Sequence, residues 1–255
     1  MKLELTPLPD IPMVHAGDNL VKMIFEGVTR AGITMCDGDI LVVAQKIVSK
    51  AEGRWENLAL IQPSAKAIIL ADTIGKDPRL VELILRDSKQ VLRTRPGTII
   101  VEHRLGFVCA NAGIDHSNVA GKGDAAEEWV LRLPEDPDAS ARSLRERLEE
   151  LFSARIGVLI IDSHGRAWRQ GVVGVAIGLS GMPGLVDMRG RSDLFGYTLR
   201  ITTIGAADEL AAAASLVMGQ VDEGTPIVHA RGFPYALREG SLAELIRPKE
   251  QDLFR

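Results

Sequence analysis

The apolar run from Ile156 to Ile161 constrains the fold of this chain more than any other segment. Its residues are almost all branched aliphatics, and the run stops at Asp162. It has the length of a strand and is too short for a typical helix, which indicates a buried strand. We therefore expect this segment to lie inside a sheet within the core.

The other expected elements alternate without a regular strand–helix–strand rhythm. We expect strands at 3–7, 40–43, 98–102, 172–179, 197–204 and 227–230. We expect helices at 19–30, from 63, from 78, at 140–153 and at 206–218, and loops at 45–54 and 133–139. This order favours an α+β or irregular mixed α/β fold over a doubly wound sheet. We expect residues 1–255 to form a single domain, or two closely packed subdomains.

Composition excludes several classes of function. The chain has 255 residues, a formal net charge of -4 and 46% hydrophobic residues, which are ordinary values for a globular protein. Mild acidity and 4% aromatic residues disfavour a nucleic-acid partner. No segment has the length of a membrane span or a signal peptide, so we expect a cytoplasmic location. Cys36 and Cys109 have neither disulfide-framework nor zinc spacing.

The common nucleotide-binding and hydrolase motifs are absent from the sequence. Gly121-Lys122-Gly123-Asp124 lacks the spacing of a phosphate-binding loop, and no GxGxxG follows an expected strand. GxSxG and HExxH are absent too. Any nucleotide would have to be held by an uncommon arrangement of residues.

Polar groups follow two expected strands near the N-terminus. Pro9 and Asp10 end the first one, where such a pair usually forms a plain turn. Residues 45–54 follow the strand at 40–43 and contain three cations, an acid and a hydroxyl. Such a run is commonly a solvated charged loop, but its cations can also bind phosphate or carboxylate oxygens. Both interpretations stay open.

Two later segments carry oxygen donors. Residues 109–118 combine small residues with polar ones and suit either an Asx-rich turn or close approach to a ligand. Asp162 ends the strongest strand, where an acid is either a cap or a functional carboxylate. If Asp115 and Asp162 meet in space, their oxygens suit Mg²⁺ or Mn²⁺ rather than zinc. His164 is a weaker candidate ligand.

At these segments the chain resembles the F420-0:gamma-glutamyl ligase family. The resemblance is carried by LPDIP at 8–12, KIVSKAEGR at 46–54, GFVCANAGIDHSN at 106–118, IIDSHGRAWRQGVVGVAIG at 160–178, DMRGRSDLFG at 187–196 and ADELAAAASLVMGQVDEGTP at 207–226. Each piece alone is weak. Their order and their spread over nearly the whole chain make the combination specific.

The resemblance implies an enzyme that uses GTP to join L-glutamate to a carboxyl group of coenzyme F420-0. It implies an acyl-phosphate intermediate and further γ-linked glutamates. Two Mg²⁺ or Mn²⁺ ions per site and K⁺ are expected cofactors. The implied fold is an irregular one particular to the family, assembled as an intertwined homodimer. The C-terminal flavin-reductase-like domain of some relatives is not expected here.

The resemblance also assigns roles to individual residues. The expected metal ligands are Asp115, Asp162, Ser163 and Gln220. The expected nucleotide contacts are Leu8, Pro9, Asp10, Ile11, Gln45, Lys46, Lys50, Asn118, Met218, Gly219, Gln220, Val221, Asp222, Glu223, Gly224 and Thr225. Asp115, Asp162 and Lys50 are the expected catalytic residues. Gln45-Lys46 departs from the Ser-Thr pair of some archaeal members.

Other interpretations remain open at this stage. The chain could be a carboxylate–amine ligase for another acid, or a non-catalytic nucleotide-binding module. No residue stands out as the base for the glutamate amine, although His116 and His164 have the right type. Four arginines could bind substrate anions or form surface ion pairs: Arg166, Arg169, Arg189 and Arg191.

Overall fold

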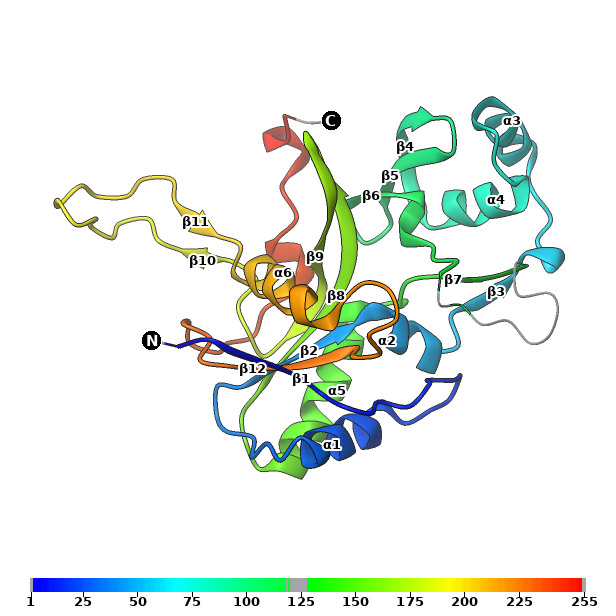
Figure 1. The fold of residues 1–255 in the computed structure, drawn as a ribbon. Helices are drawn as coiled ribbons and strands as arrows, with labels where there is room; N and C mark the ends of the chain where they lie inside the picture. The colour runs from blue at the N-terminus through cyan, green and yellow to red at the C-terminus, as the bar shows by residue number, and fades with distance from the viewer. Residues whose placement is uncertain (1, 118, 120–127, 254–255) are drawn as a thin grey trace.

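The computed structural model describes residues 2–117, 119 and 128–253 (Figure 1). Asn118 and the Gly121–Asp124 segment lie outside these residues. Helices and strands are mixed through the chain and form several separate sheets. The expected α+β fold is therefore confirmed, and the sheets do not form a doubly wound or phosphate-loop arrangement.

The largest sheet has five strands in the order β1-β12-β2-β8-β9. These strands are β1 (Glu4–Pro7), β2 (Ile40–Ala44), β8 (Gly157–Arg166), β9 (Arg169–Ser180) and β12 (Ile227–Arg231). β2 and β8 are parallel, and the other neighbours in this sheet are antiparallel. The segment expected to be the strongest strand is thus an interior strand, β8, with β2 and β9 on either side.

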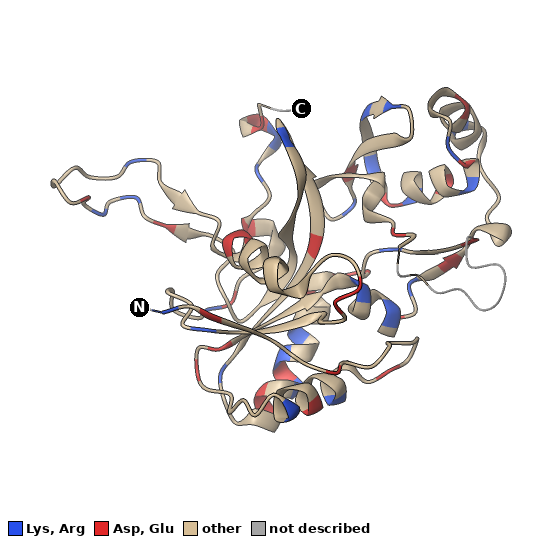
Figure 2. Ribbon diagram, viewed as in Figure 1, with Lys and Arg blue, Asp and Glu red and all other residues tan. Residues whose placement is uncertain are grey.

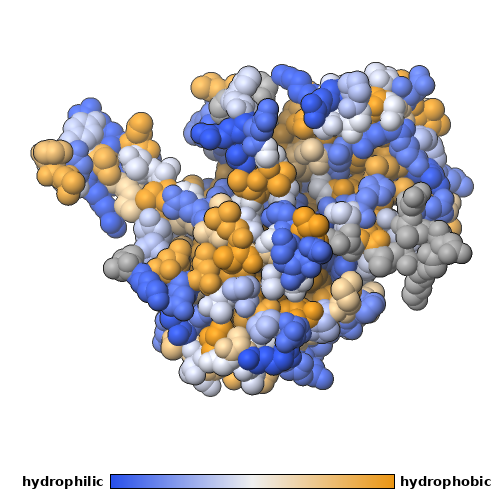
Figure 3. All heavy atoms as spheres, viewed as in Figure 1, coloured by the Kyte–Doolittle hydropathy of each residue, from blue (hydrophilic) through white to orange (hydrophobic). Residues whose placement is uncertain are grey.

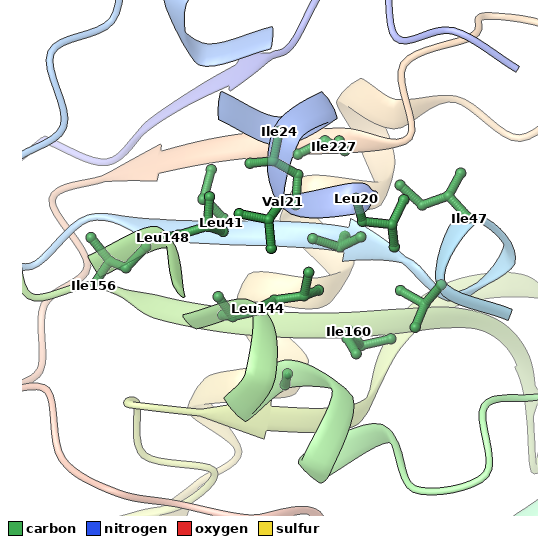
Figure 4. Close-up of a cluster of buried hydrophobic side chains, with 14 of the residues drawn as sticks. Leu20, Val21, Ile24, Leu41, Ile47, Leu144, Leu148, Ile156, Ile160 and Ile227 are labelled. Atoms are coloured by element: carbon green, nitrogen blue, oxygen red, sulfur yellow. The ribbon is translucent and has the colours of Figure 1, made fainter. Parts of the chain in front are cut away.

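Helices cover both faces of this sheet. α1 (Leu20–Arg30) and α5 (Pro137–Phe152) lie on one face, and α6 (Ala206–Met218) lies on the other (Figure 1). Leu41 and Val43 face α1 and α5 (Figure 4), whereas Ile40 and Val42 face α6. Each buried side chain of this kind contributes roughly 1.5–3 kcal/mol. Because helices cover both faces of the sheet, the residues of β2 are apolar on both sides and do not alternate with polar ones.

A smaller unit with its own apolar core lies beside the large sheet (Figure 1). Its helices are α3 (Ala65–Ile74) and α4 (Pro78–Arg86). One of its sheets contains β4 (Ser88–Arg95), β5 (Thr98–His103) and β6 (Val108–Ala110), and the other pairs β3 (Trp55–Asn57) with β7 (Trp129–Leu131). Two 3-10 turns, η1 (Leu58–Leu60) and η2 (Asn111–Gly113), also belong to this unit. Phe107 packs against this core and against the core under α1 and α5. The two units therefore share a continuous packed boundary.

The remaining elements connect these units or project from them. α2 (Gln45–Ala51) follows β2 directly, and β10 (Val186–Asp187) pairs with β11 (Thr203–Ile204) at the base of a long projection. We call residues 186–204 the arm, and Figure 1 shows it extending away from both units. The turns η4 (Leu242–Glu244) and η5 (Lys249–Gln251) lie in the C-terminal segment. No helix in the described part of the chain could cross a membrane.

The sequence misassigned some segments and missed others. Residues 45–51 form a helix rather than a loop, and polar β4 was missed altogether. α5 begins at Pro137 rather than Ser140, because Asp136 accepts a hydrogen bond from the backbone of Ala139 and proline suits the first turn. Only 203–204 of the expected strand at 197–204 are strand, since the rest runs along the exposed arm.

Candidate active site

A cavity of about 430 Å³ opens where β2 ends and β8 continues into a hairpin with β9. Its wall contains most of the residues expected to bind nucleotide and metal. These are Ile11, Gln45, Lys46, Lys50, Asp162, Ser163 and Met218 to Thr225. Segments far apart in sequence meet there because β2, β8 and β12 are adjacent in one sheet.

Helix α2 brings two lysines to this cavity, and Figure 2 shows the helix as a basic segment beside the sheet. Lys46 Nζ donates to Ser117 Oγ at 3.0 Å and lies 3.6 Å from Asp115 Oδ1. Gln45 is buried, accepts from Ser49 Oγ at 3.0 Å and donates to Asp115 Oδ2 at 2.7 Å. These contacts tie α2 to the segment that carries Asp115.

Lys50 is the most isolated cation of the cavity wall. Its side chain is 6% exposed, and in the described part of the chain its ammonium forms no ion pair with a carboxylate. It lies 5.7 Å from the centre of the Trp55 ring. Burial first, and the charge of Lys46 second, lower the pKa of Lys50. A buried cation without a carboxylate favours an anionic ligand in the cavity.

Asp162 lies on β8 just beyond its pairing with β2. Burial alone would raise the pKa of Asp162, but His164 Nε2 lies 3.0 Å from Asp162 Oδ2 and holds the pKa below its usual range. Successive residues of a strand point to opposite faces. Ser163 accordingly donates elsewhere, to Gln220 Oε1 at 2.7 Å.

Asp115 enters the site from the smaller unit. Its backbone exchanges two hydrogen bonds of 2.9 Å with Leu131, and the preceding Asn111 and Ala112 adopt left-handed conformations. Burial first, and the charge of Asp162 second, raise the pKa of Asp115 to about 6. Asp115 and Asp162 therefore lie close enough to repel each other, and a cation between them would relieve that repulsion.

The donor chemistry fits a hard divalent cation. Asp115, Asp162, Ser163 and Gln220 offer only oxygens, which suit Mg²⁺ or Mn²⁺. Across residues 2–117, 119 and 128–253, no group of three or more His, Cys, Asp and Glu side chains is placed to hold a metal ion.

The loop that follows α6 closes another side of the cavity. Gly219 has a φ of 74°, and any side chain there would collide with the carboxylate of Glu223. Glu223 in turn accepts from the backbone of Val221 at 2.9 Å, and Thr225 Oγ1 donates to the carbonyl of Met218 at 2.9 Å. These internal bonds give the loop a defined shape facing Ser163.

Several expected residues lie away from the cavity wall. Leu8 is fully buried in the core, and Pro9 and Asp10 precede the part of the chain that lines the cavity. Asn118 is outside the described residues. Arg189 pairs with Asp187 on the arm, as in the surface ion-pair interpretation. The sequence also missed wall residues with no polar signal, namely Pro12, Met13, Val14 and Pro226.

Comparison with known proteins identifies the same class of enzyme. The sequence profile of the family described as F420-0:Gamma-glutamyl ligase matches residues 10–232. Proteins named Coenzyme F420:L-glutamate ligase are 45% identical in Methanothermobacter thermautotrophicus (100% of both chains), 48% in Methanopyrus kandleri (99% of this chain, 98% of the relative) and 43% in Methanocaldococcus jannaschii (100% and 97%).

The fold and the cavity thus belong to a ligase. The chain is a member of the F420-0:gamma-glutamyl ligase family, which confirms the resemblance seen in the sequence. The match covers both units and the arm, because residues 10–232 include the elements from α1 to β12.

Proposed function

We propose that this enzyme joins L-glutamate to coenzyme F420-0 in the biosynthesis of coenzyme F420, with GTP as co-substrate. The observation that carries the proposal is the cavity lined by Lys46, Lys50 and Asp162, with Asp115 beside its wall, 3.6 Å from Lys46 and hydrogen-bonded to Gln45. Cations suit the phosphates of a nucleotide, and a carboxylate pair suits the ions that accompany it. The names of the relatives supply the acid and the amino acid.

We assign metal binding to Asp115 and Asp162 for one ion and to Ser163 and Gln220 for a second, with Mg²⁺ or Mn²⁺ as the ions. When bound, such ions neutralise phosphate charge and orient the reacting groups. The part played by K⁺ rests on the family resemblance alone. The close repulsion of Asp115 and Asp162 supports the first of these two sites.

The reaction follows from what a carboxylate needs before it forms an amide. A carboxylate oxygen of F420-0 attacks the γ-phosphorus of GTP, the bond to the bridging oxygen breaks, and GDP leaves with that electron pair. The neutral amine of glutamate then attacks the acyl carbon of the acyl phosphate, and phosphate leaves. The amine loses its proton as the amide forms. The same two steps repeated on the product would add γ-linked glutamates.

The residues of the chain serve mainly the first step, in which every reactant is an anion. Lys46 and Lys50 place fixed positive charge where negative charge collects on the phosphates. Burial of Lys50 strengthens this effect, because a charge acts more strongly away from water. Gln45 and Ser49 hold Asp115 in place through the hydrogen bonds described above.

The arm supports a second part of the proposal, that the enzyme is a homodimer. Leu194, Phe195 and Ile201 are 98%, 95% and 88% exposed, and Figure 3 shows hydrophobic surface at the outer end of the arm. Exposed apolar clusters of this kind mark sites of association. A second copy of the chain, bound by the arm, would cover these three side chains.

A mass-spectrometric assay tests the proposed reaction. The protein is mixed with F420-0, L-glutamate, GTP and Mn²⁺, and GTP or Mn²⁺ is omitted in parallel. We expect mass additions of one or more glutamyl units that disappear in both omissions. If the protein binds GTP and Mn²⁺ but adds no glutamate to F420-0, its substrate at this site is another carboxylic acid. Absence of both addition and GTP binding would overturn the proposal.

A further inference from the structure

Three aromatic rings form a column behind the carboxylates of the cavity. The rings of His164 and Phe107 have centroids 5.3 Å apart, and the rings of Phe107 and His103 are stacked 4.9 Å apart and nearly parallel, at 2°. At one end of the column, His164 Nε2 lies 3.0 Å from Asp162 Oδ2. The column thus begins at an expected metal ligand on the large sheet and ends in the smaller unit.

The far end of the column is rigidly held. His103 is fully buried, and its Nδ1 accepts from the backbone of Leu105 at 3.1 Å. The backbone N–H of His103 donates to the carbonyl of Phe107 at 2.8 Å, which closes the turn between β5 and β6. The ring of Phe107 is therefore fixed from its own side by a tight turn and by the stacked imidazole.

This column lies at the boundary between the two units. Phe107 packs against the core of the smaller unit and the core under α1 and α5. From Phe107 the chain runs along β6 and through η2 to Asp115, whereas His164 is two residues from Asp162 on β8. Phe107, just before β6, and His164, on β8, are therefore in ring contact where the segments that lead to the two carboxylates meet.

We propose that Phe107 and His164 are positioning residues that set the separation of Asp115 and Asp162 across the boundary. The inference rests on the proposed function, because it concerns the ion held between these carboxylates. Packed rings resist compression, so the contact fixes how closely β6 approaches β8. The hydrogen bond from His164 orients one carboxylate, as outer-shell partners of ligands commonly do.

Binding of Mn²⁺ without nucleotide or F420-0 tests the inference independently of turnover. Free Mn²⁺ is followed by electron paramagnetic resonance during titration of wild type, Phe107→Leu, Phe107→Tyr and His164→Phe. The matched control is Phe152→Leu, because Phe152 stacks on Phe25 at 5.3 Å, on helices away from the cavity. Thermal unfolding of each protein checks that the variants are folded.

We expect Phe107→Leu to weaken Mn²⁺ binding 10- to 100-fold, the usual effect of losing an outer-shell partner. Phe107→Tyr keeps the ring and should bind within threefold of wild type. His164→Phe keeps the ring but loses the hydrogen bond, and should weaken binding about 10-fold. Phe152→Leu should lower thermal stability while leaving Mn²⁺ affinity within twofold of wild type.

Each other outcome has a separate meaning. Wild-type affinity in folded Phe107→Leu and His164→Phe would overturn the positioning role and leave the proposed function intact. An equal loss in Phe152→Leu would also overturn it, because the effect would then be general destabilisation. If Phe107→Leu fails to fold, His164→Phe decides the question: wild-type affinity would overturn the positioning role, and a loss of about 10-fold would support it. Wild type without Mn²⁺ affinity would instead reject the metal site of the proposed function.

Discussion

The two sides of the cavity are built in different ways. Asp162 lies on β8, a long interior strand whose backbone hydrogen bonds with β9 fix its position. Asp115 lies in an irregular segment after two left-handed residues, held by one bridge to Leu131 and by side chains from α2. One carboxylate is positioned by a regular element, and the other by polar contacts between units.

The two carboxylates also differ in the direction in which their pKa values are shifted. Burial raises the pKa of Asp115 to about 6, and the charge of Asp162 adds to this. Burial acts on Asp162 in the same direction, yet its hydrogen bond with His164 leaves its pKa lowered. The comparison teaches that the partners of a buried carboxylate, more than its depth, decide which of a close pair stays ionised.

The largest expected effect on activity comes from changing Asp162, the carboxylate on the regular strand. Asp162→Asn should lower glutamyl transfer at least 1000-fold, about 4 kcal/mol of barrier, because it removes a carboxylate proposed to hold a metal ion at the phosphate site. The mass-spectrometric assay measures it, with circular dichroism to check the fold. Asp187→Asn on the exposed arm is the control and should stay active. Activity of Asp162→Asn within tenfold of wild type would remove Asp162 from the catalytic residues.

A buried ion pair stabilises the smaller unit, which contains the irregular segment that holds Asp115. Asp87 accepts from Arg132 at 2.6 and 2.8 Å, and Arg132 follows the residue that bridges to Asp115. Asp87→Asn should lower the free energy of unfolding by about 3 kcal/mol, because it leaves Arg132 partly unpaired in the interior. Urea unfolding at pH 7 measures this, with exposed Asp72→Asn as the control.

The same pair predicts a pH dependence. Burial would raise the pKa of Asp87, but the hydrogen bonds and charge of Arg132 more than offset it, so the folded pKa is lowered. Its contribution to stability is therefore present above the unfolded pKa of about 3.9 and lost as pH falls through the folded pKa. The stability difference between wild type and Asp87→Asn should narrow below about pH 4. A constant difference down to pH 2 would contradict this origin.

Loss of the hydrogen bond from Gln45 to Asp115 should have a smaller effect, on Mn²⁺ affinity. Gln45→Met keeps the length of the side chain but removes the donor to Asp115 Oδ2. Mn²⁺ affinity should fall about 10-fold, within the range for a lost outer-shell partner, since Asp115 is no longer oriented. Gln62→Met, on an exposed loop, is the matched control. Equal affinities for the two variants would mean that the bridge to Leu131 positions Asp115 alone.

The smallest expected effect concerns the ring beside the buried lysine. Trp55→Leu should weaken GTP binding about 3- to 5-fold, since a cation–π contact contributes roughly 0.5–1 kcal/mol. Isothermal titration calorimetry measures the change. Trp168→Leu, at the exposed tip of the β8–β9 hairpin, should bind GTP like wild type. A loss above 30-fold would assign Trp55 a direct contact with the nucleotide.

Local sequence patterns accounted for most of the regular elements. The apolar runs at 40–43, 156–161 and 227–230 are strands, and the last two were expected for the same reason as the first. Asn19 caps α1 as expected, accepting from the backbone of Lys22. These features depend on residues a few positions apart, so the amino-acid order alone contains the needed information.

Where local signals were weak, packing decided the structure. α2 has no capping side chain, and its polar sequence resembles a loop, yet five of its residues are buried against the sheet and neighbouring segments. β4 is polar because it lies at an edge of its sheet with much of its surface exposed. The two sides of the arm are joined by separate backbone hydrogen bonds rather than by a continuous ladder, so residues 197–202 do not form a strand despite their composition.

The sequence by itself determined most strands of the large sheet and the helices that cover it and, through a resemblance spread over the chain, the family to which the chain belongs. It also marked Asp162, because an acid directly after a buried strand stands out. Only the tertiary structure decided that Gln45 meets Asp115, 70 residues away, and that Phe107 packs against both cores. It also decided that Lys50 is buried without an ion pair to any carboxylate among the described residues. Such contacts depend on how sheets and helices pack, and no local periodicity records that packing.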